Sequence, residues 1–349
     1  MKDWPYEAHP TGWYQIAYSA ELAAGDVRPV KYFGEDMVLF RTTDGEVGLL
    51  DAYCPHLGAH LGHGGIAREG CIQCPWHAWR WGTDGTNVEI PYADRVTNRV
   101  SAGPWPVREI DGIVLTWYDA LGREPFWEWP GLPEFKDTDG YYPIYPHCAV
   151  DVGQRAIKPQ SPLENTPDYH HFIYVHGAGE AAEPTLWEED GHYLHAQSTL
   201  RMGVGREVTW LTPDGPITAY IDTEAWGLGL GLARMTFGER IAAHLISCTP
   251  IDDEMSQMFS TIGMTREPGD DGDEPTGVAR KLVAMQNDQI SNDFHIWENQ
   301  RFVKDPVFVG KEERAYARFR RWTTQFYPDV SAAQGNGSAS DRERVSVQS

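Results

Sequence analysis

The chain has 349 residues, 41% of them hydrophobic, which is enough for two modules or one large domain with a sizeable core. Acidic residues outnumber basic ones by 51 to 29, and the formal net charge of −22 argues against nucleic acid or an anionic membrane as a partner. The absence of an apolar run of about 20 residues, of a signal-peptide core in the first ten residues and of a disulfide-like framework among five cysteines predicts a cytoplasmic protein without a membrane span.

Short strands separated by turns are predicted for residues 13–135. One hairpin is centred on Thr43-Asp44-Gly45 and another on Asp111-Gly112, each between runs of apolar residues. Prolines and aromatic residues crowd residues 125–135, which predicts a linker to a second module. From about Tyr141 the pattern changes to mixed strands and longer helices.

Two pairs of cysteine and histidine lie between the hairpins: Cys54-Pro55-His56 and, after 17 intervening residues, Cys74-Pro75-Trp76-His77. Thiolates and imidazoles suit iron–sulfur or zinc centres. The C-x-H spacing is too tight for both side chains to ligate one ion comfortably, but in a Rieske [2Fe–2S] cluster one iron takes both cysteines and the other takes both histidines. The motif therefore predicts a Rieske cluster on Cys54, His56, Cys74 and His77, with a structural zinc site as the alternative.

The remaining cysteines lie outside this motif. Cys148 and Cys248 are expected to be buried small apolar side chains, and Cys71 has no assigned role. Histidine ligation gives such a cluster a potential within about −150 to +300 mV, so it accepts electrons readily from a reductase. Its irons are coordinatively full and cannot activate O2. A second site must do that chemistry.

A helix predicted over residues 164–175 carries the pattern D-x-x-H-x4-H, formed by Asp168, His171 and His176. Two histidines and one carboxylate form the facial triad of Fe(II) oxygenases, which leaves positions open for O2. His171 and His176 lie about 140° apart on an ideal helix, so both reach one metal only if the helix is distorted or ends between them. Packing of these histidines in the core is the alternative. His170 is a rival for His171 but breaks the spacing to Asp168 and His176, so it is expected to lie behind the ligands or to be incidental.

The third ligand must be an acid elsewhere in the chain. A helix predicted over residues 277–297 offers Asp288 and Asp293, and spacing alone does not separate them. A further helix over residues 312–326 has an aromatic stripe that is typical of packing. Residues 331–349 are poor in apolar side chains and are predicted to be a disordered tail.

Together these motifs resemble the alpha subunit of Rieske non-haem iron ring-hydroxylating oxygenases. The likeness covers residues 12 to about 330 and is greatest for the oxygenase components of 3-ketosteroid 9α-hydroxylases. It rests on the two cluster pairs and on four further runs: Trp79 to Gly82, His171 to His176, Asp293 to Trp297, and Arg320 to Trp322.

The resemblance implies an α+β protein. It would have an all-β Rieske [2Fe–2S] domain over residues 12–135 and a catalytic domain over residues 136–330, whose antiparallel sheet is flanked by helices. It also implies a head-to-tail homotrimer in which the cluster of one subunit serves the iron of its neighbour. By position, Asp293 becomes the third ligand of a mononuclear Fe(II). Asp168 becomes the electron-transfer bridge from His77 to His171.

The activity implied is that of the terminal oxygenase of a multicomponent monooxygenase. Because the chain lacks a G-x-G-x-x-G nucleotide site, electrons from NAD(P)H are expected to arrive through a separate flavin or iron–sulfur reductase. The aromatic-rich catalytic half suits a large apolar substrate, and 9α-hydroxylation of a 3-ketosteroid is the leading expectation. The alternatives are aromatic dihydroxylation, O- or N-demethylation, sterol desaturation, a pure electron-transfer Rieske protein and a zinc-stapled binding module. The small, Ala/Gly-rich segment 177–184 is expected at the pocket mouth.

Overall fold

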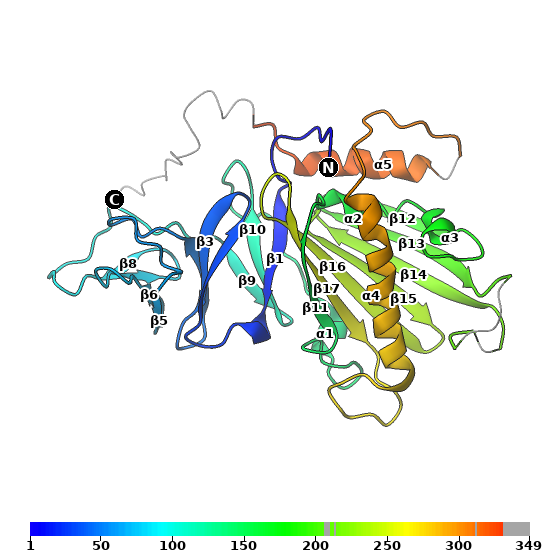
Figure 1. Ribbon diagram of the computed structural model, residues 1–349, viewed down its shortest axis with the longest axis horizontal. Coiled ribbons are helices and arrows are strands. Elements are labelled where there is room, and N and C mark those ends of the chain that lie inside the picture. Colours follow the sequence, from blue (N-terminus) through cyan, green and yellow to red (C-terminus); the bar gives the residue numbers. More distant parts are fainter. Residues whose placement is uncertain (206–209, 213, 311–312, 331–349) are drawn as a thin grey trace.

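The computed structural model describes residues 1–205, 210–212, 214–310 and 313–330. Its N-terminal part contains only short strands and one turn of 3-10 helix, whereas its C-terminal part is built on one large sheet with helices against it (Figure 1). The predicted α+β fold class is thereby confirmed. The N-terminal elements are β1 (Gly12–Tyr18), η1 (Ser19–Glu21), β2 (Val27–Tyr32), β3 (Glu35–Arg41), β4 (Val47–Asp51), β5 (Ile66–Arg68), β6 (Cys71–Gln73), β7 (Arg80–Gly82), β8 (Asn87–Glu89), β9 (Val107–Ile110) and β10 (Ile113–Tyr118).

The remaining elements are α1 (Pro133–Lys136), β11 (Ala149–Arg155), α2 (Gln160–Leu163), α3 (His171–Tyr174), β12 (Glu183–Asp190), β13 (Tyr193–Met202), β14 (Ile217–Trp226), β15 (Leu230–Phe237), β16 (Arg240–Pro250), β17 (Ser256–Met264), α4 (Gly277–Trp297), α5 (Arg314–Thr323) and η2 (Thr324–Phe326).

The N-terminal strands form three small antiparallel sheets, in the orders β1-β10-β9, β2-β3-β4 and β5-β6-β7-β8. Both predicted hairpins are confirmed, because β3 pairs with β4 across Asp44-Gly45 and β9 pairs with β10 across Asp111-Gly112. Asp111 and Gly112 have φ values of 51° and 82°, as the type I′ turn between twisted strands requires. The sheet β5-β6-β7-β8 lies at the outer end of this part (Figure 1). The cysteine and histidine pairs lie on the loops between β4 and β5 and between β6 and β7.

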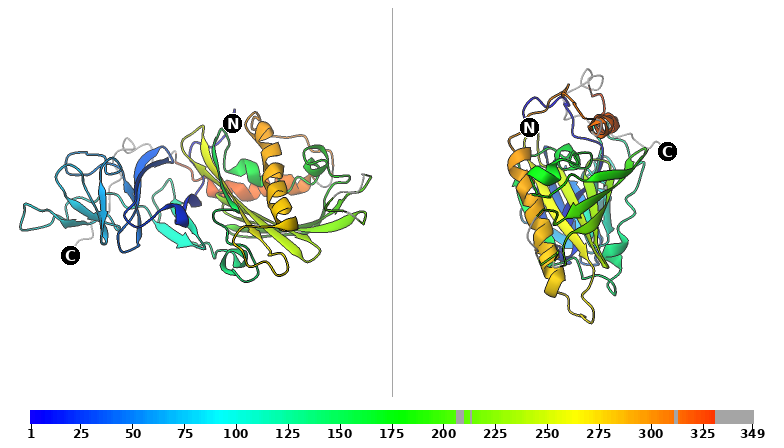
Figure 2. Two further views of the ribbon diagram at one scale, coloured as in Figure 1. Left: turned by 60° about the horizontal axis from the view of Figure 1, so that its bottom comes forward. Right: turned by 90° about the vertical axis from the view of Figure 1, so that its right-hand side faces the viewer.

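The C-terminal part contains a seven-stranded antiparallel sheet in the order β11-β17-β16-β15-β14-β13-β12. Helix α4 lies across one face of this sheet (Figures 1 and 2). It has the bounds predicted from the sequence. Its buried residues recur every three or four positions, as expected of a helix with one face against a core: Ala279, Leu282, Val283, Gln286, Ile290, Asp293, Phe294 and Trp297.

The helix predicted over residues 164–175 is wrong for most of that length, because turns and bends separate the short helices α2 and α3. Pro167 has no N–H to donate and disfavours helical backbone at the residue before it. The carboxylate of Asp168 accepts the N–H groups of the two histidines that begin α3, in competition with a continuous helix. Helix α3 then ends before His176, so the break expected after His171 is confirmed.

Helix α5 and the 3-10 turn η2 fall within the predicted helix 312–326, whose first residue lies outside the described ranges. Phe319 and Trp322 are buried in a core cluster, so the aromatic stripe is packing, as predicted. The predicted tail, residues 331–349, also lies outside the described ranges. Within those ranges, no helix combines the length and apolarity needed to cross a bilayer.

The segment predicted as a linker, residues 125–135, buries its tryptophans between the two parts of the chain. Its Trp127 and Trp129 are only 7% and 2% exposed. The indole of Trp13 on β1 donates to the carbonyl of Trp127 at 2.8 Å. The segment therefore joins the two parts through one apolar core. Side chains from both parts share that core: Trp13, Ile113, Leu115, Trp117, Trp226, Leu230, Leu232 and Leu245.

Two candidate metal centres

The four ligands predicted for the first centre lie on two loops with matching backbones. In each loop the cysteine N–H, of Cys54 or Cys74, donates to the carbonyl oxygen five residues later, at 2.8 Å in both cases. The N–H four residues after the cysteine, of Gly58 or Ala78, returns to the cysteine carbonyl. Gly58 and Ala78 both have positive φ, 78° and 58°. Alanine is uncommon in that conformation, so this loop shape is maintained even where it is strained.

The loops separate their sulfur and nitrogen donors. Cys54 and Cys74 are almost fully buried, and burial raises the pKa of the Cys54 thiol. The rings of His56 and His77 are half-buried, with centroids 4.8 Å apart, and His56 stacks on Trp79 at 4.2 Å. A thiol pair inside and an imidazole pair at the rim fit a [2Fe–2S] cluster that binds two sulfurs at one iron and two nitrogens at the other.

A buried indole adds a second observation at this centre. The Nε1 of Trp81 has no well-aligned acceptor among the residues that the structure describes, although the ring lies beside the Cys54 thiol. A sulfur atom of a cluster at this place would be an acceptor for that N–H. By contrast, Cys148 and Cys248 lie in core clusters away from the loops, so their predicted burial is confirmed. Cys71 is buried on β6.

The rim of the first centre is apolar and exposed. Large hydrophobic side chains project around the half-buried imidazoles of the two loops. The most exposed of them on the loops themselves are Trp76 at 60%, Leu57 at 58% and Tyr53 at 52%. Exposed apolar side chains gathered in this way are typical of a surface that contacts another molecule.

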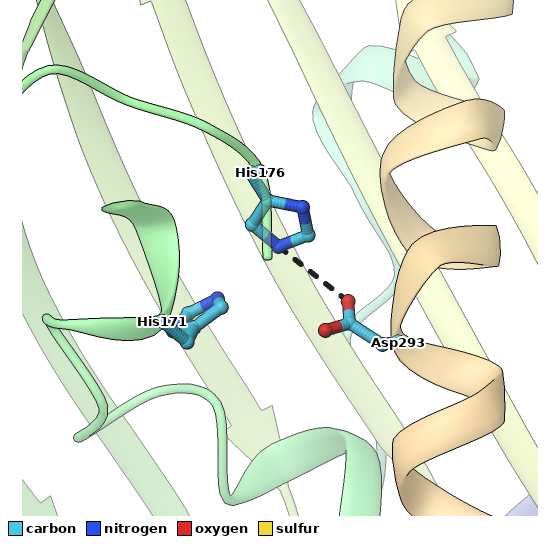
Figure 3. Close-up of side chains that lie close together, drawn as sticks. All are labelled: His171, His176 and Asp293. Carbon is cyan, nitrogen blue, oxygen red and sulfur yellow. Dashed lines mark ion pairs between the residues drawn. The ribbon is translucent and has the colours of Figure 1, made fainter. Parts of the chain in front are cut away.

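The second centre is formed by His171, His176 and Asp293, which α3, the turn after it and α4 bring together (Figure 3). One ligand atom from each of them lies within 4.8 Å of the others. The Nε2 of His176 is 3.5 Å from the Oδ2 of Asp293. Asp288, the other candidate from the sequence, is exposed on the same helix, because five residues turn a side chain to about 140° around the axis. Geometry thus separates two acids that spacing could not.

Burial dominates the electrostatics of this centre. It raises the pKa of Asp293 to about 7, against the opposing effect of the Asn165 side chain. It also lowers the pKa of His176 to about 4, with His171 adding to the shift. The Nδ1 of His176 is buried and has no hydrogen-bond partner in the described part of the chain. The donor set of a non-haem Fe(II) site consists of two neutral imidazoles and one carboxylate. Here burial has removed solvent from the carboxylate, which favours binding of a cation. These residues therefore fit that metal.

Asp168 contacts the second centre through its backbone. Its carbonyl oxygen accepts a hydrogen bond from the Nδ1 of His171, which leaves Nε2 as the nitrogen with a free lone pair. Its carboxylate instead accepts the N–H groups of His170 and His171, at 3.3 and 3.2 Å. The carboxylate therefore caps α3 within its own chain, where the resemblance implies a bridge to the imidazole. His170 is exposed.

Helix α5 anchors the segment that precedes the histidines. Glu164, at the end of α2, is 5% exposed. The hydroxyl of Tyr316 donates to its Oε2 at 2.6 Å, and the Nε of Arg320 donates to its Oε1 at 2.9 Å. A buried carboxylate needs such charge-assisted partners. These contacts fix the backbone just before Asn165, whose side chain interacts with Asp293.

The three ligands of the second centre line a cavity of about 460 Å³, within the usual range for small-molecule sites. Gly177 to Gly179 also line it, as expected for part of the segment 177–184. Most other lining side chains are apolar, among them Leu200, Met202, Ile221, Leu232, Met235 and Ile246. Among the polar exceptions, His244 and Gln286 were not anticipated from the sequence. Their only signal there is a lone histidine within the apolar run of β16.

Comparisons with known proteins agree with this geometry. Residues 116–327 match the family described as "3-Ketosteroid 9alpha-hydroxylase C-terminal domain", and residues 12–101 match the "Rieske [2Fe-2S] domain". "Cholesterol 7-desaturase nvd" of Bombyx mori is 30% identical, over 93% of this chain and 70% of its own length. "Probable 3-ketosteroid-9-alpha-monooxygenase, oxygenase component" of Rhodococcus rhodochrous is 28% identical, over 93% and 82%.

Two solved structures share the fold. Pseudomonas putida CBB5 NdmB superposes with a TM-score of 0.68 at 18% identity, covering 92% of this chain and 91% of the other. Dicamba monooxygenase with non-heme iron and dicamba superposes with a TM-score of 0.65 at 19% identity, covering 93% and 98%. At such identities the likeness concerns the fold alone.

Proposed function

The chain belongs to the Rieske non-haem iron oxygenases whose catalytic domain is of the 3-ketosteroid 9α-hydroxylase type, and from this premise we propose that it oxidises a steroid-class substrate as the terminal component of a multicomponent monooxygenase. The observation that carries the proposal is the position of His171, His176 and Asp293 in the wall of an apolar cavity. A pure electron-transfer protein or a zinc-stapled binding module needs neither the triad nor the cavity.

In this proposal Cys54, His56, Cys74 and His77 hold a [2Fe–2S] cluster, while His171, His176 and Asp293 hold a mononuclear Fe(II). When bound, the cluster supplies electrons and the mononuclear iron supplies open positions at which O2 is activated. The carbonyl of Asp168 keeps the His171 ring in the tautomer that offers Nε2. The apolar walls exclude water around the substrate.

Electrons originate from NAD(P)H and enter through a separate reductase, since the sequence has no nucleotide-binding motif of its own. The sheet beside the loops of the first centre lies at one end of the molecule, and α3, which carries a ligand of the second, lies near the other end (Figure 1). This separation and the exposed apolar rim around His56 and His77 support a homotrimer in which the cluster of one subunit serves the iron of the next. In that assembly the Asp168 carboxylate bridges His77 of one subunit to the His171 site of another. Five free cysteines suit the cytoplasm.

The first candidate reaction is 9α-hydroxylation of a 3-ketosteroid, which the name of the Rhodococcus relative indicates. A cavity of about 460 Å³ with mostly apolar walls suits a rigid, largely apolar skeleton. Aromatic dihydroxylation and demethylation have weaker support, because neither the Bombyx nor the Rhodococcus relative is named for such a reaction and the two solved structures match in fold only.

The second candidate reaction is desaturation of a sterol. The relative with 30% identity is a cholesterol 7-desaturase, and its match extends over nearly the whole chain. Both reactions use O2, two electrons and the same pair of centres, so the motifs do not separate them. What separates them is the substrate that the cavity binds.

The test is reconstitution of the purified protein with a Rieske-oxygenase reductase, NAD(P)H and O2, followed by mass spectrometry of the products. A 3-ketosteroid and cholesterol are supplied in parallel. A steroid product that gains one oxygen atom supports hydroxylation, and one that loses two hydrogens supports desaturation. Consumption of NAD(P)H without oxidation of either steroid would contradict the proposed substrate class.

A further inference from the structure

Buried polar side chains of β16 and α4 interrupt the apolar lining of the cavity away from the metal ligands. His244 on β16 is 3% exposed, and Gln286 on α4 is 4% exposed. Gln286 precedes Asp293 by seven residues, which is two helical turns or about 10 Å along the axis. A polar group buried among apolar neighbours costs free energy unless it is hydrogen-bonded. The partners of these two side chains therefore define what the far end of the cavity offers a ligand.

The hydrogen bonds around His244 define its tautomer. The Nε2 of His244 is 2.8 Å from the Oγ of Ser260, and that hydroxyl donates to the Oδ1 of Asn287 at 2.7 Å. A hydroxyl has a single hydrogen. Since Ser260 uses it on Asn287, Ser260 must accept a hydrogen bond from the Nε2–H of His244.

The other ring nitrogen of His244 is consequently an acceptor. Burial lowers the pKa of His244 to about 4, although the side chain of Gln286 opposes the shift. The imidazole is therefore neutral near pH 7, with its one hydrogen on Nε2 and a lone pair on Nδ1. No described residue donates to Nδ1.

Gln286 presents an acceptor as well. Its Nε2 donates to the Sδ of Met235 at 3.2 Å, so the amide oxygen is directed elsewhere. That Oε1 has no donor within the part of the chain that the structure describes. Even if the second hydrogen of Nε2 reaches the Nδ1 of His244, Oε1 remains an acceptor without a donor.

We propose that His244 and Gln286 form a subsite that binds a hydroxyl group of the otherwise apolar substrate, two turns of α4 from Asp293. A hydroxyl donates to these lone pairs, whereas a ketone offers only lone pairs of its own. A ketone or a hydrocarbon would leave the buried acceptors without a partner. The subsite would thereby determine which carbon of the skeleton lies at the triad. This inference rests on the proposed steroid class and, within it, favours a hydroxysterol over a 3-ketosteroid.

The test compares three ligands with one saturated skeleton: 3β-hydroxyandrostane, its 3-ketone and the parent androstane. Binding to the iron-loaded protein is followed by quenching of tryptophan fluorescence, since Trp210 and Trp297 line the cavity. We expect the alcohol to bind at least about tenfold more tightly than the ketone or the hydrocarbon, which corresponds to one good hydrogen bond. In Gln286→Leu and in His244→Phe, the preference for the alcohol over the hydrocarbon should disappear, while the affinity for the hydrocarbon should not fall, because an acceptor without a partner has been removed.

Asp288→Asn is the control, because Asp288 is exposed on the same helix and its substitution should alter no affinity. Iron and sulfide contents establish that each variant is folded. Tighter binding of the ketone, or an equal loss of affinity for all three ligands in both variants, would overturn the subsite. Tight binding of all three ligands without preference would overturn the hydroxyl-binding subsite but would leave the proposed steroid class intact. Failure of every steroid to bind the loaded protein would overturn the proposed substrate class as well.

Discussion

In the N-terminal centre the four predicted ligands lie on two loops between Cys54 and His77 that repeat one backbone pattern, whereas the C-terminal centre takes its ligands from α3, the turn after it and α4. The first set divides into buried thiols and half-buried imidazoles near the surface. The second set lies in the wall of a cavity and depends on how a helix crosses a seven-stranded sheet. The ligands of a centre formed by two local loops can be predicted from residue spacing. The ligands of a centre assembled by tertiary structure cannot all be predicted in that way.

The largest effect is expected for Cys74→Ser, which removes a ligand of the N-terminal centre. We expect loss of the whole cluster, with both of its irons and both sulfides, because a cluster requires all four ligands together. The mononuclear iron should remain. Anaerobic purification with iron and sulfide analysis and EPR of the reduced protein measures this, since the unaltered protein should contain about three irons and two sulfides per chain.

Cys71→Ser is the control for Cys74→Ser, because Cys71 is also buried but lies outside the motif. It should keep the cluster and its EPR signal. Retention of the cluster in Cys74→Ser, or zinc in place of iron in the unaltered protein, would mean that the first centre is misassigned.

Asp293→Ala should remove one iron and spare the cluster. The triad loses its only carboxylate, and turnover should fall to background because, in the proposed function, this iron provides the positions at which O2 is activated. Iron analysis, EPR of the cluster and product formation are measured together. Asp288→Ala, on the exposed side of the same helix, should change none of them. An iron-replete, active Asp293→Ala variant would contradict the assignment of the third ligand.

Asp168→Asn should leave both centres loaded and yet nearly abolish turnover. An asparagine oxygen can still accept the two N–H groups that begin α3, so the fold of this segment should persist, while the charge proposed to bridge two subunits is lost. The measurement pairs metal content with the rate at which a reduced cluster is reoxidised in the presence of O2 and substrate. Glu183→Gln, an exposed acid at the start of β12, serves as the control. Substantial activity in Asp168→Asn would remove the bridging role.

Tyr316→Phe should have the smallest effect, a loss of about 2 kcal/mol of stability, because one hydrogen bond to the buried carboxylate of Glu164 disappears. Arg320 still neutralises that carboxylate, so iron content and turnover should change little. The shift of the urea midpoint measures the loss. Tyr174→Phe, whose side chain is 83% exposed, should leave the midpoint where it is. Equal effects of the two substitutions would show that the contact with α5 contributes nothing.

The difference between local and tertiary determinants explains which features of the fold and of the two centres could be predicted from the sequence. Hairpins such as Asp111-Gly112 and the cluster loops follow from neighbouring residues, and α4 follows from a long periodic pattern, so all of these could be predicted. The helix over residues 164–175 failed because Pro167 and Asp168 favour turns there. Choosing Asp293 over Asp288 from geometry required knowledge of which side of α4 faces the sheet.

The cavity and its polar end could not have been predicted either. Alternate residues of several strands line it, and the order of those strands is set by packing over long sequence distances. The tautomer of His244 depends on Ser260 and Asn287, which only the folded sheet and helix bring together. The trimer, the reductase and the boundary at residue 135 remain predictions.

The tryptophan-rich junction has a consequence for evolution and for engineering. The segment 125–135 contributes to a core with side chains from both halves. A half that is moved alone by recombination would therefore leave part of this core without its packing partners. A chimera that joins a foreign electron-transfer half at residue 135 would place unmatched indoles against Trp226 and Leu245. Exchange of one half between relatives should therefore succeed only when the residues of segment 125–135 match the core side chains of the half that they pack against. Such coupling would lead the two halves to diverge together, even though each contains a different kind of chemistry.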